Sequence, residues 1–435
     1  MLQVFQNIFK IPELKKRILI TLGFLAVYRF GAHIPTPGVD AQVLTEIFES
    51  AQGTVLGMVD MFTGGALKRL TVFALGIMPY ISTSIILQLL TVVVPYLERL
   101  AKEGEQGRKK INQYTRYGTV VLSAIQALGI AIGLENMQGP GGAPVVPVPG
   151  WGFRLITLIT LTAGTAFIMW LGEQMTERGI GNGISMIIFA GIVVRMPAGV
   201  VNTIEAIRRG EFSLFTLIGI AFMMVLVVAA VIIMQQGMRK IPVQYAKRVV
   251  GRRIYGGQST HIPLRVNTAG VIPVIFASSI IVFPATVARF VNHPWMQAAA
   301  EHLSPGHMLY TVIYAILIIF FAYFYTAIVF NPTDLAENMK KYGGYIPGVR
   351  PGKRTASYID SVLTRITLSG AIFLALIAIL PEFLSYSLNV PFYFGGTGLL
   401  IVVGVALDTM QQIESHLLTR HYDGFMKKGR LRGRR

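Results

Sequence analysis

The chain has 435 residues, of which 53% are hydrophobic and only 14% are charged, and its formal net charge at pH 7 is +18. Soluble domains carry about 25% charged residues, so this composition is typical of a membrane protein. The absence of cysteine excludes disulfide bonds, thiolate chemistry and cysteine-based zinc sites.

Ten apolar segments follow one another along the chain, each close to the ~20 residues that a helix needs to cross a ~30 Å hydrocarbon core. The first follows Lys15, Lys16 and Arg17, and no small-residue cleavage site comes after it. We therefore interpret it as a retained span and not as a removable signal peptide. The pattern predicts an all-α polytopic membrane protein with spans at residues 18–34, 72–94, 118–134, 154–171, 183–200, 214–235, 269–290, 309–330, 362–384 and 393–412.

A short segment before the second span, MFTGGALKRL at residues 61–70, does not fit this pattern. It is too short to cross a membrane, and its end is too polar. The Gly64–Gly65 pair suggests a short re-entrant element that folds into the protein from the outer side.

Several segments are broken by glycine and proline at membrane depth, among them those at Pro79 inside the second span and at Pro273 near the start of the seventh. Proline inside a membrane helix frees a backbone carbonyl, and it is tolerated where neighbouring groups or a cavity satisfy that carbonyl. The two interpretations that stay open are a break beside a cavity and a simple kink.

Few residues in the predicted spans could carry chemistry. No Lys, Asp, Glu or His lies near the middle of any span, and Asp408 lies toward the cytoplasmic half of the last one. This argues against ion-coupled transporters and proton pumps, which need ionisable groups at the midplane. Intramembrane protease motifs are also absent, and the seven histidines show no ligand spacing. GIGNG at 179–183 follows a membrane helix and not a strand, so a tight turn is favoured over a phosphate-binding loop.

The longest basic loop, residues 239–265, separates the sixth and seventh spans and contains no acidic residue. Its glycines and prolines favour a segment that projects outward, which suits docking on phosphate-rich or acidic macromolecules. The alternative is attraction to anionic lipid headgroups, at about 1 kcal/mol per basic residue near the surface. Its cations are Arg239, Lys240, Lys247, Arg248, Arg252, Arg253 and Arg265.

The distribution of basic residues predicts the orientation of the protein. The positive-inside rule places the basic loop in the cytoplasm, and an even number of spans places both termini there as well. Most lysines and arginines then lie on the cytoplasmic side, including the basic tail KKGRLRGRR, which could instead face lipid. The predicted outer loops hold only Lys68, Arg69, Arg195, Arg208, Arg209 and Arg289.

Several long motifs, in order and over nearly the whole chain, resemble the SecY family of channel-forming subunits of the bacterial protein translocon. The resemblance is carried by MFTGGALKR (61–69), ALGIMPYISTSIILQLL (74–90), EGEQGRKKINQYTRYGT (103–119), WLGEQMTERGIGNGIS (170–185), YAKRVVGRRIYGGQSTHIPLRVNTAGVIPVIFASS (245–279), NPTDLAENMKKYGGYIPGVRPGKRT (331–355) and PFYFGGTGLLIVV (391–403). The chain departs from the family pattern only in a shorter segment around 291–307.

The resemblance implies a clamshell of two pseudo-symmetric five-helix halves, although no internal repeat is visible in the sequence. The N-terminal half would cover residues 1–210 and the C-terminal half residues 211–412, with cytoplasmic loops near 236–266 and 331–360. Residues 413–435 would form a basic tail. Such a channel translocates unfolded polypeptides and releases transmembrane segments sideways into lipid.

The same resemblance implies a location in the bacterial plasma (inner) membrane. The implied partners are the membrane subunits SecE and SecG, the motor ATPase SecA, ribosomes with their rRNA phosphates, signal peptides, nascent chains and anionic lipids. We expect no enzymatic activity and no cofactor, because no nucleotide-binding loop is present. A small-solute permease is the alternative, since permeases also have helices broken by glycine and proline.

The resemblance also assigns a pore constriction to six isoleucines. Taken alone, an isoleucine in a membrane helix is more often a packing or lipid-facing residue. The i, i+4 spacing within two pairs puts each pair on one helix face. An apolar collar cannot hydrogen-bond water, so it dewets and closes the pore. The ring residues are Ile77, Ile81, Ile184, Ile188, Ile275 and Ile401.

Three further sites follow from the resemblance. Segment 60–70 matches the plug, a short element seated on the outer side of the ring; its central residues are Met61, Phe62, Thr63, Gly64, Gly65, Ala66 and Leu67. The lateral gate is assigned to Ser82, Gln126 and Phe283, and the two polar residues would weaken packing between its halves. Partner docking is assigned to Arg252, Arg253 and Arg350; without the resemblance, Arg350 would be interpreted as a solvated loop charge.

Overall fold

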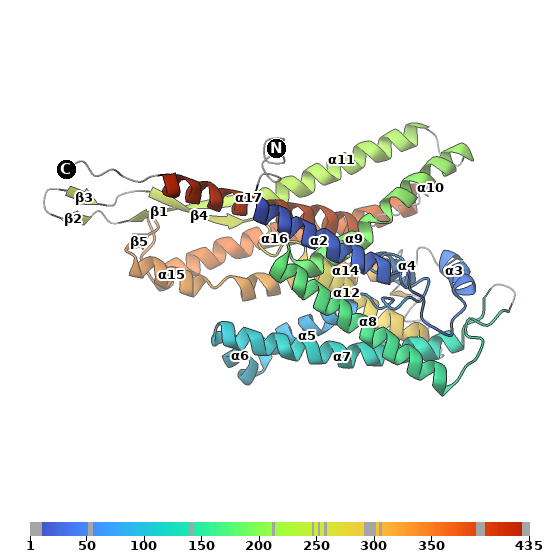
Figure 1. The fold of residues 1–435 in the computed structure, drawn as a ribbon. Coiled ribbons are helices and arrows are strands. Elements are labelled where there is room, and N and C mark those ends of the chain that lie inside the picture. The colour runs from blue at the N-terminus through green and yellow to red at the C-terminus, as the bar shows by residue number, and fades with distance from the viewer. Residues whose placement is uncertain are drawn as a thin grey trace. The chain divides into compact units, whose positions relative to one another are not determined.

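A computed structural model of the protein describes residues 11–50, 55–139, 142–210, 214–245, 248–250, 253–255, 259–290, 302–303, 307–388 and 396–428. The fold is built mainly from helices (Figure 1). They are α2 (Pro12–Gly31), α3 (Ala41–Ser50), α4 (Val55–Phe62), α5 (Met78–Val93), α6 (Pro95–Lys102), α7 (Glu105–Glu135), α8 (Trp151–Arg178), α9 (Gly183–Val193), α10 (Met196–Arg208), α11 (Leu214–Gln236), α12 (Ile272–Phe290), α14 (Met308–Val329), α15 (Pro332–Lys341), α16 (Lys353–Leu388) and α17 (Gly396–Lys428).

The mainly helical membrane fold predicted from the sequence is confirmed, and each of the ten predicted spans falls on a helix. Within the described part of the chain, six helical stretches are long and apolar enough to cross a membrane, and a seventh if the bent pair α5–α6 counts as one span. Helix α12 contributes a shorter apolar stretch at Ile272–Ile281. A count of ten spans is consistent with these helices and stays a prediction.

Proline determines where α5 ends and α6 begins. Val94 has an extended backbone, with φ −96° and ψ 113°, as expected for a residue that precedes proline. Pro95 then occupies the first turn of α6, where a missing N–H does no harm. The chain bends by 99° at this point. Helix α6 buries Leu97 and Leu100 and exposes its charged face, so it is amphipathic.

The described chain divides into two compact units. Unit 1 comprises residues 1–203, 279–307 and 405–435, and unit 2 comprises residues 204–278 and 308–404. The expected halves, 1–210 and 211–412, stay a prediction.

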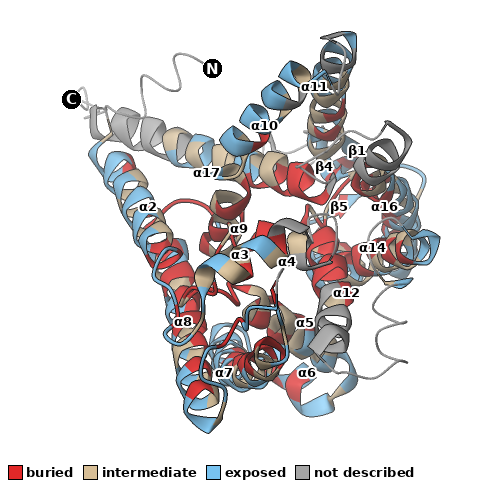
Figure 2. Ribbon diagram, turned by 90° about the vertical axis from the view of Figure 1, so that its right-hand side faces the viewer, coloured by how far each residue is buried: buried red, intermediate tan, exposed pale blue. Residues whose placement is uncertain are grey.

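Unit 1 has a buried apolar core contributed by α3, α7, α8 and the turns before α5. In α7 and α8, buried and exposed residues occur in the same helix (Figure 2). Val121, Ile125 and Ile159 are apolar and exposed, which suits helices whose outer side faces lipid. The core residues include Leu44, Phe48, Leu67, Leu70, Leu75, Ile130, Leu134, Phe153 and Leu161.

Helix α8 approaches the turn before α5 so closely that only glycine fits between them. A Cβ added at Gly164 would lie 1.9 Å from the backbone oxygen of Val72. Backbone atoms cannot move aside as a flexible side chain does, so the helix itself would have to shift.

We expect Gly164→Ala to destabilise the protein by about 1–3 kcal/mol, the usual effect of overpacking a core. The matched control is Gly129→Ala in α7, where a Cβ would meet nothing within 4 Å. Thermal unfolding of the purified variants should show a lower midpoint for Gly164→Ala only. Equal midpoints for the two variants would contradict the close approach.

Unit 2 contains strands that the sequence pattern did not predict. Strands β1 (Met238–Tyr245), β4 (Ser259–Arg265) and β5 (Gly344–Tyr345) form an antiparallel sheet in the order β4-β1-β5. Strands β2 (Arg248–Val250) and β3 (Arg253–Tyr255) form a separate two-stranded ladder. The basic loop between the sixth and seventh predicted spans is therefore a structured hairpin.

The sheet is attached to the helices of unit 2 by one face of β1. Ile241 and Val243 are buried, and the residues that alternate with them are exposed, as the two-residue period of a strand requires. They pack in one apolar cluster with Leu264 of β4, Met339 of α15 and Ile359 of α16. The cationic side chains of Arg239 and Lys240 are left exposed.

Candidate functional site

The predicted plug segment is shaped by the way helix α4 ends. Gly64 and Gly65 have φ angles of +67° and +87°, a left-handed conformation that glycine adopts without strain. The N–H of Gly65 donates to the carbonyl of Asp60 at 2.9 Å, and the N–H of Gly64 donates to that of Met61 at 3.2 Å. This pair of bonds is the Schellman ending of a helix. The chain therefore reverses its direction at the glycine pair.

One buried carboxylate joins the two ends of this segment. Asp60 Oδ1 accepts a hydrogen bond from the backbone N–H of Lys68 at 3.0 Å, and Oδ2 accepts one from Nη1 of Arg195 at 3.0 Å. The Asp60 side chain is only 4% exposed, whereas that of Arg195 is 33% exposed. Burial raises the pKa of the Asp60 carboxyl, while the charge of Arg195 and the N–H of Lys68 act to lower it. These donors therefore stabilise the charged form of the buried carboxylate.

Helices α2 and α9 complete a seat for the segment. Tyr28 donates its hydroxyl to the carbonyl of Thr63 at 3.1 Å, and Nη1 of Arg29 donates to the carbonyl of Gly64 at 3.0 Å. Gly64 also lies against Gly191 of α9, with space for no side chain: a Cβ on Gly64 would be 3.0 Å from the Gly191 Cα. We call the contacts from Tyr28, Arg29, Gly191 and Arg195 the seat of segment 60–70.

Pro79 and Pro273 lie at the starts of helices and do not kink them. Pro79 lies in the first turn of α5, and Pro273 lies in the first turn of α12. Both positions tolerate a missing N–H, so the interpretation as a simple kink is wrong; the break lies in the turns at 72–77 and 266–271 that precede the two helices. The residues before α5 form turns, and Gly76 among them has a φ of +57°.

Five of the six predicted ring isoleucines are buried. Ile77 and Ile81 lie one turn apart, with the N–H of Ile81 donating to the carbonyl of Ile77 at 3.1 Å. Ile184 is half-buried, and its Cγ1 lies 3.1 Å from where a Cβ on Gly172 would be. Ile77, Ile81, Ile184 and Ile188 belong to unit 1, and Ile275 and Ile401 belong to unit 2. The buried members are Ile77, Ile81, Ile188, Ile275 and Ile401.

The GIGNG segment is a tight turn, as predicted. The N–H of Ile180 donates to the Thr21 hydroxyl at 3.0 Å, and that of Gly181 donates to Gln412 Oε1 at 2.9 Å. Asn182 then caps α9 by accepting the N–H groups of Ile184 and Ser185. Since these amide donors already have partners in the protein, the turn is not an open phosphate cradle. Its effect is to fix the start of the helix that carries Ile184 and Ile188.

The predicted gate residues lie on three helices. Ser82 on α5 and Gln126 on α7 are both half-buried, and these two helices pack against each other. Phe283 lies on α12, and its side chain is outside the described residues.

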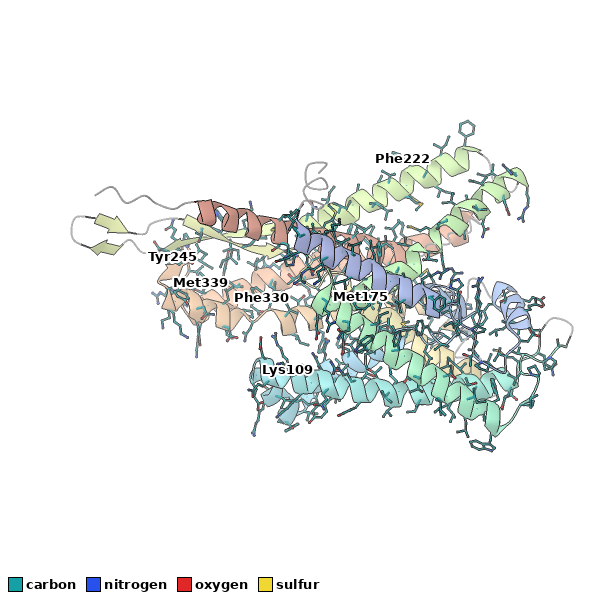
Figure 3. All side chains as sticks on the ribbon, in the orientation of Figure 1. Lys109, Met175, Phe222, Tyr245, Phe330 and Met339 are labelled. Atoms are coloured by element: carbon teal, nitrogen blue, oxygen red, sulfur yellow. The ribbon has the colours of Figure 1, made fainter. Side chains whose placement is uncertain are left out.

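The structure joins the two predicted docking loops through one sheet. Arg350 is exposed and follows β5, which pairs with β1 through Gln244 and Tyr345. Arg253 begins β3, but its side chain is outside the described residues, as is the whole of Arg252. Tyr245 of β1 and Met339 of α15 lie at the same end of unit 2 (Figure 3). No sequence signal relates the two loops, because β5 is only two residues long.

Residues 71–410 match the family model described as SecY. The protein translocase subunit SecY of Escherichia coli strain K12 is 52% identical over 425 residues, covering 97% of this chain and 96% of that protein. The protein translocase subunit SecY of Aquifex aeolicus strain VF5 is 45% identical over 429 residues, covering 98% of this chain and all of that protein.

Solved channel structures share the fold. The structure described as that of a protein conducting channel has a TM-score of 0.66 and 17% identity, covering 95% of this chain and 97% of that one. Sec61 in a canine ribosome–channel complex from the endoplasmic reticulum has a TM-score of 0.62 and 16% identity, with the same coverage. A SecY structure concerned with its plug domain has a TM-score of 0.64 and 18% identity, again with the same coverage.

Proposed function

The chain belongs to the SecY family of protein translocase subunits, and we propose that it forms the channel through which unfolded polypeptides cross the membrane. The observation that carries this function is near-full-length similarity to protein translocase subunits, at 45% to 52% identity. The chain is a multi-pass membrane protein with several apolar helices. The relatives and structures described above are translocase or channel proteins, and they give no support to a small-solute permease.

Within that channel, the isoleucine ring is the constriction and segment 60–70 is the plug. The burial of five ring isoleucines is compatible with the first assignment and argues against a lipid-facing role, which would leave them exposed. The seat built by α2 and α9 supports the second, because it holds a short element that ends in a turn. Ser82, Gln126 and Phe283 line the gate for sideways release of apolar segments.

The channel resides in a bacterial inner membrane with both termini in the cytoplasm. The one-sided distribution of lysine and arginine supports this orientation, and the bacterial sources of the relatives support the location. Its role is conduction without catalysis. We propose SecE, SecG, SecA and ribosomes as partners, with signal peptides and nascent chains as clients; the canine neighbour was solved with a ribosome.

The function is tested by restoring this chain to membrane vesicles depleted of their own translocase subunit. We expect import of a secretory protein that bears its signal peptide, and no import of the same protein without it. Uptake of small solutes without import of the secretory protein would contradict the proposed function.

Partner binding should depend on Arg252 and Arg350. Basic residues that contact phosphates release counterions, so affinity falls steeply as salt rises. We expect the double variant Arg252→Glu/Arg350→Glu to bind ribosomes more weakly and with a shallower dependence on salt. Binding is measured between low and moderate salt. Arg208→Glu, in a predicted outer loop, is the matched control, and the docking role is wrong if the two variants give the same affinity and slope.

A further inference from the structure

Asp60 takes part both in the folding of segment 60–70 and in its attachment to the rest of unit 1. Its Oδ1 accepts the N–H of Lys68, eight residues along the chain, and so closes the segment on itself. Its Oδ2 meets Arg195, which lies in the turn between α9 and α10, 135 residues away. The same carboxylate therefore couples the internal shape of the segment to a fixed point in unit 1.

The contacts of the seat differ in kind. Those from Tyr28 and Arg29 go to backbone carbonyls, which water can hydrogen-bond equally well once the segment leaves. The contact from Arg195 goes to a charged group that is almost fully buried. A buried carboxylate that loses its partner is strongly destabilised, so this contact has the largest effect on whether the segment stays seated.

We infer that the Asp60–Arg195 ion pair is the positioning contact that determines how often segment 60–70 leaves its seat in the resting channel. This inference rests on the proposed role of that segment as the plug. Arg195 acts through Asp60 and is therefore a positioning residue. We call this ion pair the latch. It consists of these two side chains and includes none of the ring isoleucines.

Unequal burial of the two partners predicts unequal effects of removing them. Arg195→Gln leaves the Asp60 carboxylate buried, with only the charge of Lys68 and backbone donors to stabilise it. Asp60→Asn keeps an oxygen that can accept the N–H of Lys68, and it leaves behind a guanidinium that is already one-third exposed and can turn to water. The first change should therefore loosen the segment far more than the second.

It follows that Asp60→Asn should suppress the effect of Arg195→Gln. Once the carboxylate is neutral, no buried charge needs a partner, and the missing guanidinium matters little. Arg195→Lys keeps the positive charge and should restore most of the closed state. If Arg195→Gln acted only through lost packing, Asp60→Asn would not suppress its effect and Arg195→Lys would not restore the closed state.

The absence of native cysteine gives a direct measurement of how often the segment is released. Thr63→Cys places one thiol in the segment at a position that is only 1% exposed. A membrane-impermeant maleimide reacts with it only when the segment leaves its seat, so the labelling rate reports the fraction of open time. The experiment uses the full chain in resting membranes, with Thr63→Cys as the common background.

We expect Arg195→Gln to raise the labelling rate by about tenfold or more, since each tenfold corresponds to about 1.4 kcal/mol. Asp60→Asn, the double variant Asp60→Asn/Arg195→Gln and Arg195→Lys should stay within a few-fold of the background. Arg209→Gln is the matched control, because it breaks a solvent-exposed ion pair with Glu205 at 3.3 Å, outside the seat. Thermal unfolding is measured for every variant, to separate release of the segment from loss of the fold.

The latch is wrong if Arg195→Gln labels no faster than Arg209→Gln. It is also wrong if adding Asp60→Asn does not lower the labelling rate of Arg195→Gln. Replacing residues 61–66 by glycine and serine tests the plug itself. A raised resting conductance in that replacement, together with unchanged labelling of Arg195→Gln, would overturn the latch and leave the plug in place. An unaltered conductance in the replacement would overturn the plug.

Discussion

A channel whose residues 61–66 are replaced by a glycine–serine stretch of equal length conducts ions intermittently at rest and still translocates polypeptides. This is the result we expect if segment 60–70 is the plug, because the replacement removes the folded element and leaves the constriction intact. Resting conductance is measured in planar bilayers, and translocation is measured in vesicles. Loss of the fold, or an unaltered resting conductance, would show that the segment has a structural role.

The structure decides where that replacement has to stop. Leu67 and Leu70 belong to the buried core of unit 1, and the carbonyl of Leu70 accepts the N–H of Thr36 at 2.8 Å. Deleting all of residues 60–70 would therefore also remove part of the core. Keeping Asp60 and Leu67 in place separates the plug from its supports.

Polar substitution of the ring should have the second large effect. Replacing Ile81, Ile188 and Ile275 together by serine would let water wet the constriction, because a hydroxyl can hydrogen-bond water and an isoleucine side chain cannot. An ion then passes without losing its hydration, so we expect a clear rise in single-channel conductance without substrate. We also expect the gate to open for signal segments of lower hydrophobicity.

Ile187→Ser is the control for this experiment. Ile187 is the neighbour of Ile188 in α9 and is 1% exposed, and its Cδ1 faces Gly172 of α8 at 3.4 Å from an added Cβ. Because Ile187 and the three replaced ring residues are all buried, both variants should lose stability, and thermal unfolding will show this. Only the ring variant should leak. The pore assignment is wrong if the ring variant conducts no more than the parent, or if the ring variant and Ile187→Ser conduct equally.

Much of the helical fold could be predicted, because a membrane span has a strong signal in apolar length. The predicted spans all fall on helices, and the turn at Gly64–Gly65 follows from the conformational freedom of glycine. The strands of unit 2 escaped prediction because the loop is dominated by basic residues, and the apolar side of β1 amounts to Ile241 and Val243. The start of α5 at Met78 escaped as well, because hydropathy continues across the turn before it.

The candidate site was less accessible to sequence reasoning. Asp60 and Arg195 are 135 residues apart, and each alone is an ordinary charge near a predicted outer loop. Their pairing depends on how the turn after α9 approaches the end of α4, which no local pattern encodes. The ring isoleucines required the family resemblance, since isoleucine is common on every face of a membrane helix.

The meeting of Gly64 with Gly191 has a consequence for the speed of the channel. Side chains that interdigitate must change rotamer before two surfaces can separate, and such unlocking slows a motion. Here the facing surfaces are bare backbone, with a Cβ on Gly191 only 2.9 Å from the Phe62 carbonyl oxygen. At this contact we therefore expect segment 60–70 to separate from α9 without any change of rotamer. Close packing of Gly64 on Gly191 is therefore compatible with rapid separation at this contact.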